Sequence, residues 1–323
     1  MLSIKPDKIL VDIEGDFMKS VMTVCGKISG DDMGYTLSHE HLIVSPELSD
    51  EKYDDYRLLD VDLMCGEVEK FKRKSGKTIA EMTPLNYGRD PLKYREIAQR
   101  EDINIICCTG FHKEEFLPEQ AFELSETDLV NMLLAEINNG IDGTDIHPGV
   151  IKCGTSYNNI TDTEKKTIKT VAKVHMLTGI PVSTHCDKGT MILEQGDLLV
   201  KNGISPENIL LGHTDIQKDL DTQLEALKRG FNILTDHVGR ELDNTDEDRI
   251  RNLEIMIRKG FVNQLFLSGD MGKKDYITTY GGKPGLDYIL GVFKDKFVRE
   301  IGRKYFDKIT IDNPKRFFSF QIK

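Results

Sequence analysis

Several common sequence features are missing from this chain, and each absence excludes a class of protein. No run of 18 apolar residues occurs, so the sequence predicts no transmembrane helix. The N-terminal region lacks the apolar segment of a secretory signal peptide, which favours a cytoplasmic location. Neither a GxGxxG nor a GxxxxGK(S/T) motif is present, which argues against the usual nucleotide-binding turns.

The chain also lacks tryptophan, paired cysteine motifs and an excess of basic residues. Its six cysteines form no CxxC pair, and two of them, Cys107 and Cys108, are adjacent in an apolar run. This spacing predicts free thiols in place of a disulfide framework. The formal net charge of −11 argues against nucleic acid or an anionic membrane as a general partner. A local basic pocket for an anionic small molecule is compatible with that charge.

Short apolar runs that end in polar or ionisable residues recur along the chain. Apolar residues make up 39% of the sequence, which suffices for a buried core. Longer segments with helical periodicity separate the runs. One of these segments starts at Thr161 or Asp162, as helix N-caps do, and stops at Gly179. The eight apolar runs span residues 34–44, 78–84, 104–112, 149–156, 180–187, 208–215, 231–238 and 264–272.

This alternation of buried strands and amphipathic helices is typical of parallel βα units. Eight such units predict the α/β class and, within it, a (β/α)8 TIM barrel. A doubly wound open sheet is the structural alternative, although it usually has fewer strands. We expect residues 1–25 to form a lead-in segment and residues 26–323 to form a single barrel domain.

Ionisable side chains gather at the C-terminal ends of the predicted strands, where barrel active sites lie. His39 and His41 are two residues apart in a strand, so their imidazoles are expected on the same face. Such a pair suits a divalent transition metal, although two hydrogen-bonded core histidines are the alternative. His185, His213 and Asp270 occupy three further strand ends. Together these five side chains predict a site for one or two metal ions.

Lys152 stands inside a predicted strand, at the level of these ligands. A buried ammonium group beside metal cations would be repelled, and burial favours the neutral amine. A neutral amine can react with carbon dioxide to form a carbamate, whose anionic oxygens can bridge two metals. The alternative is a lysine that reaches the rim of the barrel or pairs with an acid. Among these neighbours the carbamate, N6-carboxylysine, is the favoured interpretation.

Five ordered motifs resemble those of the phosphotriesterase-related proteins of the amidohydrolase superfamily, which include the phosphotriesterase-like lactonases. They are GYTLSHEHL, GVIKCGTS, STHCDKGT, GHTD and SGDMG, and the resemblance extends from about residue 26 to the C-terminus. It implies a dinuclear centre at the C-terminal ends of the barrel strands. The implied metal is usually zinc, with manganese or cobalt as alternatives. The resemblance assigns His39, His41 and Asp270 to the more buried ion, His185 and His213 to the more exposed ion, and carboxylated Lys152 with a hydroxide to the bridge.

The resemblance also implies a hydrolytic mechanism. The metal-bridging hydroxide would attack the substrate, and Asp270 would act as general base and later as general acid. His237 and Asp215 would carry the proton outward, although Ile216 stands where the family often has a second acid. For the remaining histidines, we expect His112 and His147 to be structural, and we assign no role to His175.

The loops after the last two strands suggest the substrate class. Loop residues Arg240, Lys273, Lys274, Tyr276 and Tyr280 concentrate cations and phenols beside the predicted metal site of an acidic protein. Such groups bind a phosphate monoester or a carboxylate through charge-assisted hydrogen bonds. The resulting hypothesis is a lactonase that opens small phosphorylated sugar lactones.

Three other interpretations of the sequence stay open. Lys273 and Lys274 can be ordinary solvated residues. In that case a promiscuous phosphotriesterase or an acyl-homoserine lactonase is the next candidate. A catalytically silent, metal-stabilised binding protein is the third. Dimers are common among barrels of this kind, but the sequence carries no interface signature.

Overall fold

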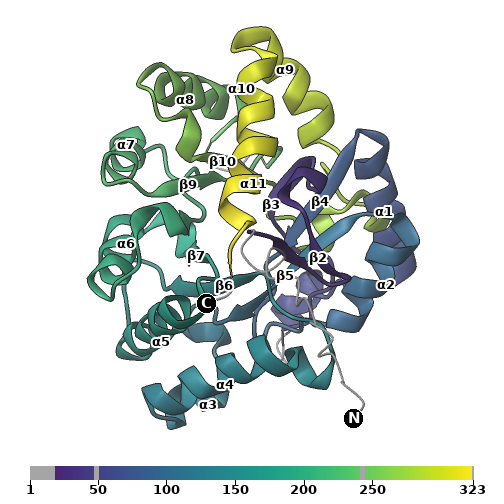
Figure 1. Cartoon of the computed structure of the whole chain (residues 1–323). Coiled ribbons are helices and arrows are strands. Elements are labelled where there is room, and N and C mark those ends of the chain that lie inside the picture. The colour runs from purple at the N-terminus through teal and green to yellow at the C-terminus, as the bar shows by residue number, and fades with distance from the viewer. Residues whose placement is uncertain (1–18, 47–50, 241–243, 322–323) are drawn as a thin grey trace, which may run out of the picture.

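A single sheet of eight parallel strands, arranged in the order of the chain from β3 to β10, forms the centre of the molecule. The structure is a computed structural model that describes residues 19–46, 51–240 and 244–321. Helices cover the outer face of the sheet (Figure 1). The strands of the main sheet are β3 (Tyr35–Glu40), β4 (Gly76–Glu81), β5 (Asn104–Gly110), β6 (Val150–Thr155), β7 (Val182–Cys186), β8 (Ile209–Leu211), β9 (Asn232–Thr235) and β10 (Leu265–Leu267).

The first and last strands of this sheet meet and nearly close it into a barrel. The backbone N–H of Asp270 donates to the carbonyl of His39 at 3.2 Å, and the N–H of His39 donates to Ser268 Oγ at 2.9 Å. Each of the eight predicted apolar runs overlaps one strand of the barrel. The prediction of a (β/α)8 barrel is therefore confirmed, and the open doubly wound sheet was the wrong alternative.

The helices begin and end where local side chains satisfy their free backbone groups. In α5, the Thr161 hydroxyl accepts from the N–H of Glu164, whose carboxylate accepts from the N–H of Thr161. This capping box fixes the first turn, and Gly179, with φ of 78°, ends the helix. The helices are α1 (Val61–Arg73), α2 (Pro91–Glu101), α3 (Glu119–Glu123), α4 (Glu126–Asn139), α5 (Asp162–Thr178), α6 (Ile192–Lys201), α7 (Leu220–Lys228), α8 (Asp246–Arg258), α9 (Lys294–Glu300), α10 (Arg303–Asp307) and α11 (Asn313–Phe318).

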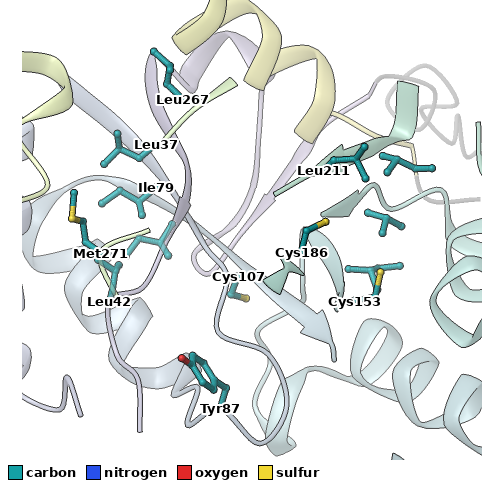
Figure 2. Packing of buried hydrophobic residues seen from close by; sticks show 14 of the residues in the cluster. Leu37, Leu42, Ile79, Tyr87, Cys107, Cys153, Cys186, Leu211, Leu267 and Met271 are labelled. Carbon is teal, nitrogen blue, oxygen red and sulfur yellow. The ribbon is translucent and has the colours of Figure 1, made fainter. Parts of the chain in front are cut away.

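Two apolar clusters sit on opposite faces of the barrel wall. The larger cluster lies between the strands and the helices and includes Ile79, Cys153 and Leu211 (Figure 2). The smaller cluster is built from the alternate strand positions, such as Val150 and Phe266, and fills the barrel interior. Side chains thus alternate between the two faces of the barrel wall.

A hairpin and the last helix close the N-terminal end of the barrel. The hairpin pairs β1 (Val21–Thr23) with β2 (Gly26–Ile28), and Val21 packs in the inner cluster together with Phe317 and Phe318 of α11 (Figure 1). The proposed domain boundary after residue 25 falls within this hairpin. The division of the chain at that point stays a prediction, and residues 1–17 lie outside the described residues.

The cysteines of the chain form no disulfide in the structure. All six cysteines carry free thiols, and only Cys25 among them is exposed. Among the described residues, no helix has both the length and the apolar character that crossing a lipid bilayer would need.

Candidate metal centre and active site

The C-terminal ends of the barrel strands bring together the side chains that the sequence singled out. Lys152 and His185 lie within β6 and β7, and His39 lies within β3. The others follow a strand directly, within one to three residues of its end: His41, His213, His237 and Asp270. All of them are at least partly buried, so the barrel fixes their positions relative to one another.

A change of register in β3 turns His39, like His41 just after the strand, into the barrel. Leu37 pairs with Ile79 and packs toward the helices, whereas the next register pair joins Glu40 with Glu81. The irregularity lies between Leu37 and Glu40, so strict alternation does not hold there. Without it, His39 would share the outward face of Leu37. The bulge therefore places the first histidine of the HxH motif at the site.

His39, His41 and Asp270 form the first potential metal-binding group. Each offers one ligand atom, and these atoms lie within 4.8 Å of one another. Asp270 Oδ1 lies 3.3 Å from His41 Nε2 and 3.7 Å from His39 Nε2. Burial lowers the pKa of His41 to about 4, so its imidazole is neutral near pH 7. A neutral imidazole is the form that binds a metal.

Lys152 reaches the same place from the opposite side of the barrel. Its side chain is fully buried, and its Nζ lies 3.4 Å from His39 Nε2 while donating to the carbonyl of Met82 at 2.7 Å. Burial lowers the pKa of the Lys152 amine, against the opposing effect of Cys108, Asp270 and other acids. The amine is thus biased toward its uncharged, nucleophilic form.

His185 and His213 form the second pair of imidazoles. His213 Nε2 lies 2.7 Å from His185 Nδ1. The other nitrogen of His185, Nε2, lies 3.9 Å from Asp187 Oδ1. The two nitrogens that face each other, His213 Nε2 and His185 Nδ1, are therefore the ring atoms that could bind one metal ion together. Burial lowers the pKa of His185 to about 3, which keeps this imidazole neutral as well.

The two carboxylate oxygens of Asp270 face different partners. Oδ1 faces the imidazoles of β3, whereas Oδ2 lies 3.7 Å from His237 Nε2 and 2.8 Å from Arg240 Nη1. Asp270 also adopts φ of 47°, in the left-handed region that a non-glycine residue rarely occupies. Strain of this kind is usually found at functional positions. The arrangement lets one carboxylate serve a ligand role and a proton-transfer role at once.

Buried acids stand behind His237. Asp236 Oδ1 lies 3.0 Å from His237 Nδ1, and Asp215 Oδ1 lies 3.4 Å from the same nitrogen. Although burial opposes ionisation, His237 and Arg249 hold the pKa of Asp215 well below its usual range. Burial and Arg240 lower the pKa of His237, but the two acids outweigh them and raise it. A line of proton-accepting groups therefore runs from Asp270 through His237.

A cavity of about 1000 Å³ opens above these groups. Of the predicted substrate-binding residues, Arg240, Lys273 and Tyr276 line it. Lys274 and Tyr280 are not among the lining residues, and the Tyr280 hydroxyl instead accepts from the N–H of Asp60 at 2.9 Å. The structure therefore brings three of the five together at the site.

Arg240 and Tyr276 form one wall of this cavity. The guanidinium carbon of Arg240 lies 4.3 Å from the centre of the Tyr276 ring, and Nη2 lies 3.4 Å from the Tyr276 hydroxyl. Lys273 Nζ lies over the ring of Tyr56 at 4.4 Å. The positive charge of this wall thus borders Asp270 directly.

The opposite wall contains groups that the sequence analysis did not assign to the site. Lys113 lines the cavity but is paired with Asp187 at 2.9 Å and with Glu115 at 3.0 Å. His112, which we expected to be structural, also lines the cavity, and its ring centre lies 4.2 Å from that of His185. In contrast, His147 Nδ1 bonds the carbonyl of Ile137 at 2.9 Å, as a structural histidine would.

The family model described as "Phosphotriesterase family" matches residues 19–318. This chain belongs to the phosphotriesterase family. A relative named phospho-furanose lactonase, from Mycoplasmopsis synoviae, is 32% identical over 94% of this chain and 93% of its own length.

Solved structures of phosphotriesterase-family proteins share the whole fold. A lactonase from Listeria monocytogenes superimposes with a TM-score of 0.90 at 31% identity, covering 93% of this chain and 99% of its own. The Escherichia coli phosphotriesterase homology protein is described as complexed with phosphate in its active site. It superimposes with a TM-score of 0.85 at 33% identity, covering 89% of this chain and 99% of its own.

Phosphotriesterase-family proteins are hydrolases that depend on a dinuclear metal centre, and the donor set here suits such a centre. Neutral imidazoles and a carboxylate such as that of Asp270 are ligand types that divalent transition-metal ions bind. The residues that hold the ligands in place are less obvious in the sequence. Asp236 lies within 4 Å of Nδ1 of three site histidines (His39, His213 and His237). Its position in TDHV, directly before His237, was the only signal for it.

Glu40, the middle residue of the HEH motif, is the second such residue. Its buried carboxylate accepts from the N–H of Gly269 at 2.6 Å and from the N–H of Met271 at 2.9 Å. It also accepts from the Ser268 hydroxyl at 2.7 Å. These bonds bracket Asp270 and hold the strained turn that presents it.

Proposed function

We propose that this phosphotriesterase-family hydrolase is a lactonase that opens small phosphorylated sugar lactones. The observation that carries the proposal is the cationic wall of Arg240 and Lys273 beside Asp270, in a cavity large enough for a sugar phosphate. A relative named phospho-furanose lactonase and a solved relative with phosphate in its active site support it.

We assign the two divalent ions, with zinc as the first choice and manganese or cobalt as alternatives, to the donors described above. His39, His41 and Asp270 would hold one ion, and His185 and His213 the other. The neutral Lys152 amine would attack the carbon of carbon dioxide and lose one proton, which yields an anionic carbamate between the two sites. When bound, the ions supply Lewis acidity that activates water and polarises the lactone carbonyl.

The side chains of this chain would handle the proton of the attacking water. Asp270 Oδ2 is placed to accept it and faces His237 Nε2 at 3.7 Å. His237 can pass a proton toward Asp236 and Asp215, whose carboxylates lie beside its Nδ1. When the bond between the carbonyl carbon and the ring oxygen breaks, the proton held at Asp270 can return to that leaving oxygen. The product is a hydroxy acid.

We assign recognition of the phosphate to Arg240, Lys273 and Tyr276. A guanidinium, an ammonium and a phenol can each donate to phosphate oxygens, and charge-assisted bonds of this kind are strong. Lys274 and Tyr280 do not line the cavity, so the proposal omits them.

The test compares kcat/KM for a pentono-lactone 5-phosphate with that for its dephosphorylated twin, using the fully metallated enzyme. A preference of tenfold or more, about 1.4 kcal/mol, is expected for the phosphorylated substrate. Lys273→Ala should raise KM for that substrate by about tenfold, because it removes one charge-assisted hydrogen bond. The measurement is steady-state kinetics in a pH-indicator assay.

Lys274→Ala is the matched control, because Lys274 is the next residue and does not line the cavity. It should leave both substrates unaffected. Equal rates for the two lactones would contradict the proposal and favour the alternative, a promiscuous phosphotriesterase or acyl-homoserine lactonase.

A further inference from the structure

The loop that follows β10 carries Lys273 and Tyr276, two of the three proposed phosphate-binding residues, and is folded tightly on itself. This segment, residues 271–286, is called loop 8 below. The N–H of Lys283 donates to the carbonyl of Asp275 at 2.8 Å, and the N–H of Gly285 donates to the carbonyl of Tyr276 at 2.9 Å. Tyr276 therefore sits where two legs of the loop are joined.

A buried carboxylate from helix α1 holds both legs of loop 8. Glu67 is fully buried, and its Oε1 accepts from the N–H of Leu286 at 3.0 Å. Its Oε2 accepts from the N–H of Thr279 at 3.1 Å and from the Thr278 hydroxyl at 2.6 Å. Burying a carboxylate is costly unless such donors surround it. Lys70 Nζ, one turn along α1, lies 3.5 Å from Oε2, and loop 8 supplies the three hydrogen bonds named above.

The contact leaves no spare room. Gly285 has φ of +90°, and a Cβ placed on it would lie 2.6 Å from Glu67 Oε1. Loop 8 can approach the carboxylate this closely only because residue 285 has no side chain. The docking of the loop on α1 is therefore specific in geometry as well as in hydrogen bonding.

The position of loop 8 is transmitted to the cavity through Tyr276. Its ring lies 4.3 Å from the guanidinium carbon of Arg240, and Arg240 in turn bonds Asp270. A shift of the loop would move the Tyr276 hydroxyl and the Lys273 ammonium relative to the reacting centre. Displacements of about 1 Å at substrate-positioning groups are enough to cost catalysis.

We propose that Glu67 is a positioning residue that sets the preference of the enzyme for an anionic substrate. It acts by docking loop 8 on α1, and it touches neither the substrate nor the metal ligands. The inference rests on the proposed function, because the groups that it positions are those assigned to the phosphate.

The test is Glu67→Gln, with Glu69→Gln as the matched control. Glu69 is on the same helix, but it is half exposed and pairs with Arg73 at 2.6 Å on the surface. A glutamine at position 67 keeps the shape of the side chain, but one of its two oxygens is replaced by an NH2 group, which is a donor. The loop donors that face this NH2 group lose their acceptor and are left unpaired. KM for the phosphorylated lactone should rise about tenfold. Turnover of the dephosphorylated lactone and the metal content should stay within twofold.

A second readout does not depend on substrate. Backbone amides of residues 274–286 should exchange with deuterium faster in Glu67→Gln than in the wild type, whereas Glu69→Gln should match the wild type. If Glu67→Gln does not fold, Thr278→Val is the second variant. It removes the hydroxyl that donates to the same carboxylate and accepts from Lys70 Nζ, leaves both backbone donors in place, and should give a smaller change in the same direction.

The outcomes separate the two claims. A wild-type enzyme with no preference for the phosphorylated lactone overturns the proposed function and, with it, the role of Glu67 in specificity. A wild-type preference that Glu67→Gln retains, with unchanged exchange in loop 8, overturns the inference about Glu67 alone.

Discussion

Lys152 shows how burial of a single residue selects its chemistry. The amine is enclosed beside His39, and its hydrogen bond goes to a backbone carbonyl in place of a carboxylate. Burial lowers the pKa of this amine, against the opposing effect of Cys108 and nearby acids, and so makes the charged form less favourable than in water. A structural lysine would instead keep its charge and pair with an acid. The environment thus agrees with the carbamate that we propose.

The first prediction concerns this lysine. Lys152→Met should reduce bound metal to less than half of the wild-type content and lower kcat by at least 10²-fold, because an anionic bridging ligand is lost. Metal analysis by mass spectrometry and steady-state kinetics measure the two effects. Lys173→Met, on the exposed face of α5, is the control and should change neither. Full metal content and full rate in Lys152→Met would disprove the carbamate.

At the scale of elements, the junction between β3 and β10 determines where Asp270 points. Closure of the barrel brings the HEH segment against the turn after β10, and Glu40 accepts hydrogen bonds from both sides of Asp270. Burial raises the pKa of Glu40 to about 7, and the donors of the turn oppose that rise. The left-handed conformation of Asp270 is thus held by a neighbouring strand, because its own residue type does not favour it.

The corresponding prediction is that Glu40→Gln loosens this turn. One of the two backbone amides loses its acceptor, so kcat should fall by about 10² and the unfolding free energy by about 1–3 kcal/mol. Kinetics and chemical denaturation measure these changes. Ser268→Ala removes only the hydroxyl donor and should have the smaller effect on both. Equal losses in the two variants would contradict the assignment of this role to the Glu40 carboxylate.

At the scale of the whole molecule, the proposed metal donors come from strands spread around the barrel. The HEH motif belongs to β3, Lys152 to β6 and His185 to β7, while His213 and Asp270 follow β8 and β10. Ions bound there would connect distant parts of the sheet, including the seam between its first and last strands. Since unfolding separates these donors, metal binding stabilises only the folded state.

Removing the metal should therefore lower the midpoint of thermal unfolding. At a free metal concentration of 100 times Kd, the expected stabilisation is about 2.7 kcal/mol. Calorimetry of chelated and zinc-reloaded protein measures it. His147, which bonds the Ile137 carbonyl, supplies the control: His147→Asn should leave the metal-dependent shift intact. A midpoint that is unchanged by chelation would contradict a dinuclear centre at these residues.

Much of the fold, and the gathering of the candidate ligands at one end of the barrel, was accessible from the sequence. The eight apolar runs each overlap a strand, and Thr161 and Gly179 mark the start and end of α5 as expected. Strand period, caps and motif spacing are local properties, so a linear sequence carries them. The histidines and Asp270 followed from the same logic, because the ends of parallel strands meet at one rim.

Other features depended on contacts between residues far apart in the chain. Glu67 accepts a hydrogen bond from loop 8, more than 200 residues later in the chain. The Asp236 carboxylate lies beside three histidines that belong to or follow three different strands. Tyr280 is drawn to Asp60 instead of the cavity, although it lies only four residues from Tyr276. Periodicity and local motifs predicted the barrel and the candidate ligands at its C-terminal rim. Only the tertiary structure decided which loop side chains line the cavity and which buried acids position the loop and the histidines. The physical reason is that both depend on packing between segments that are far apart in the sequence.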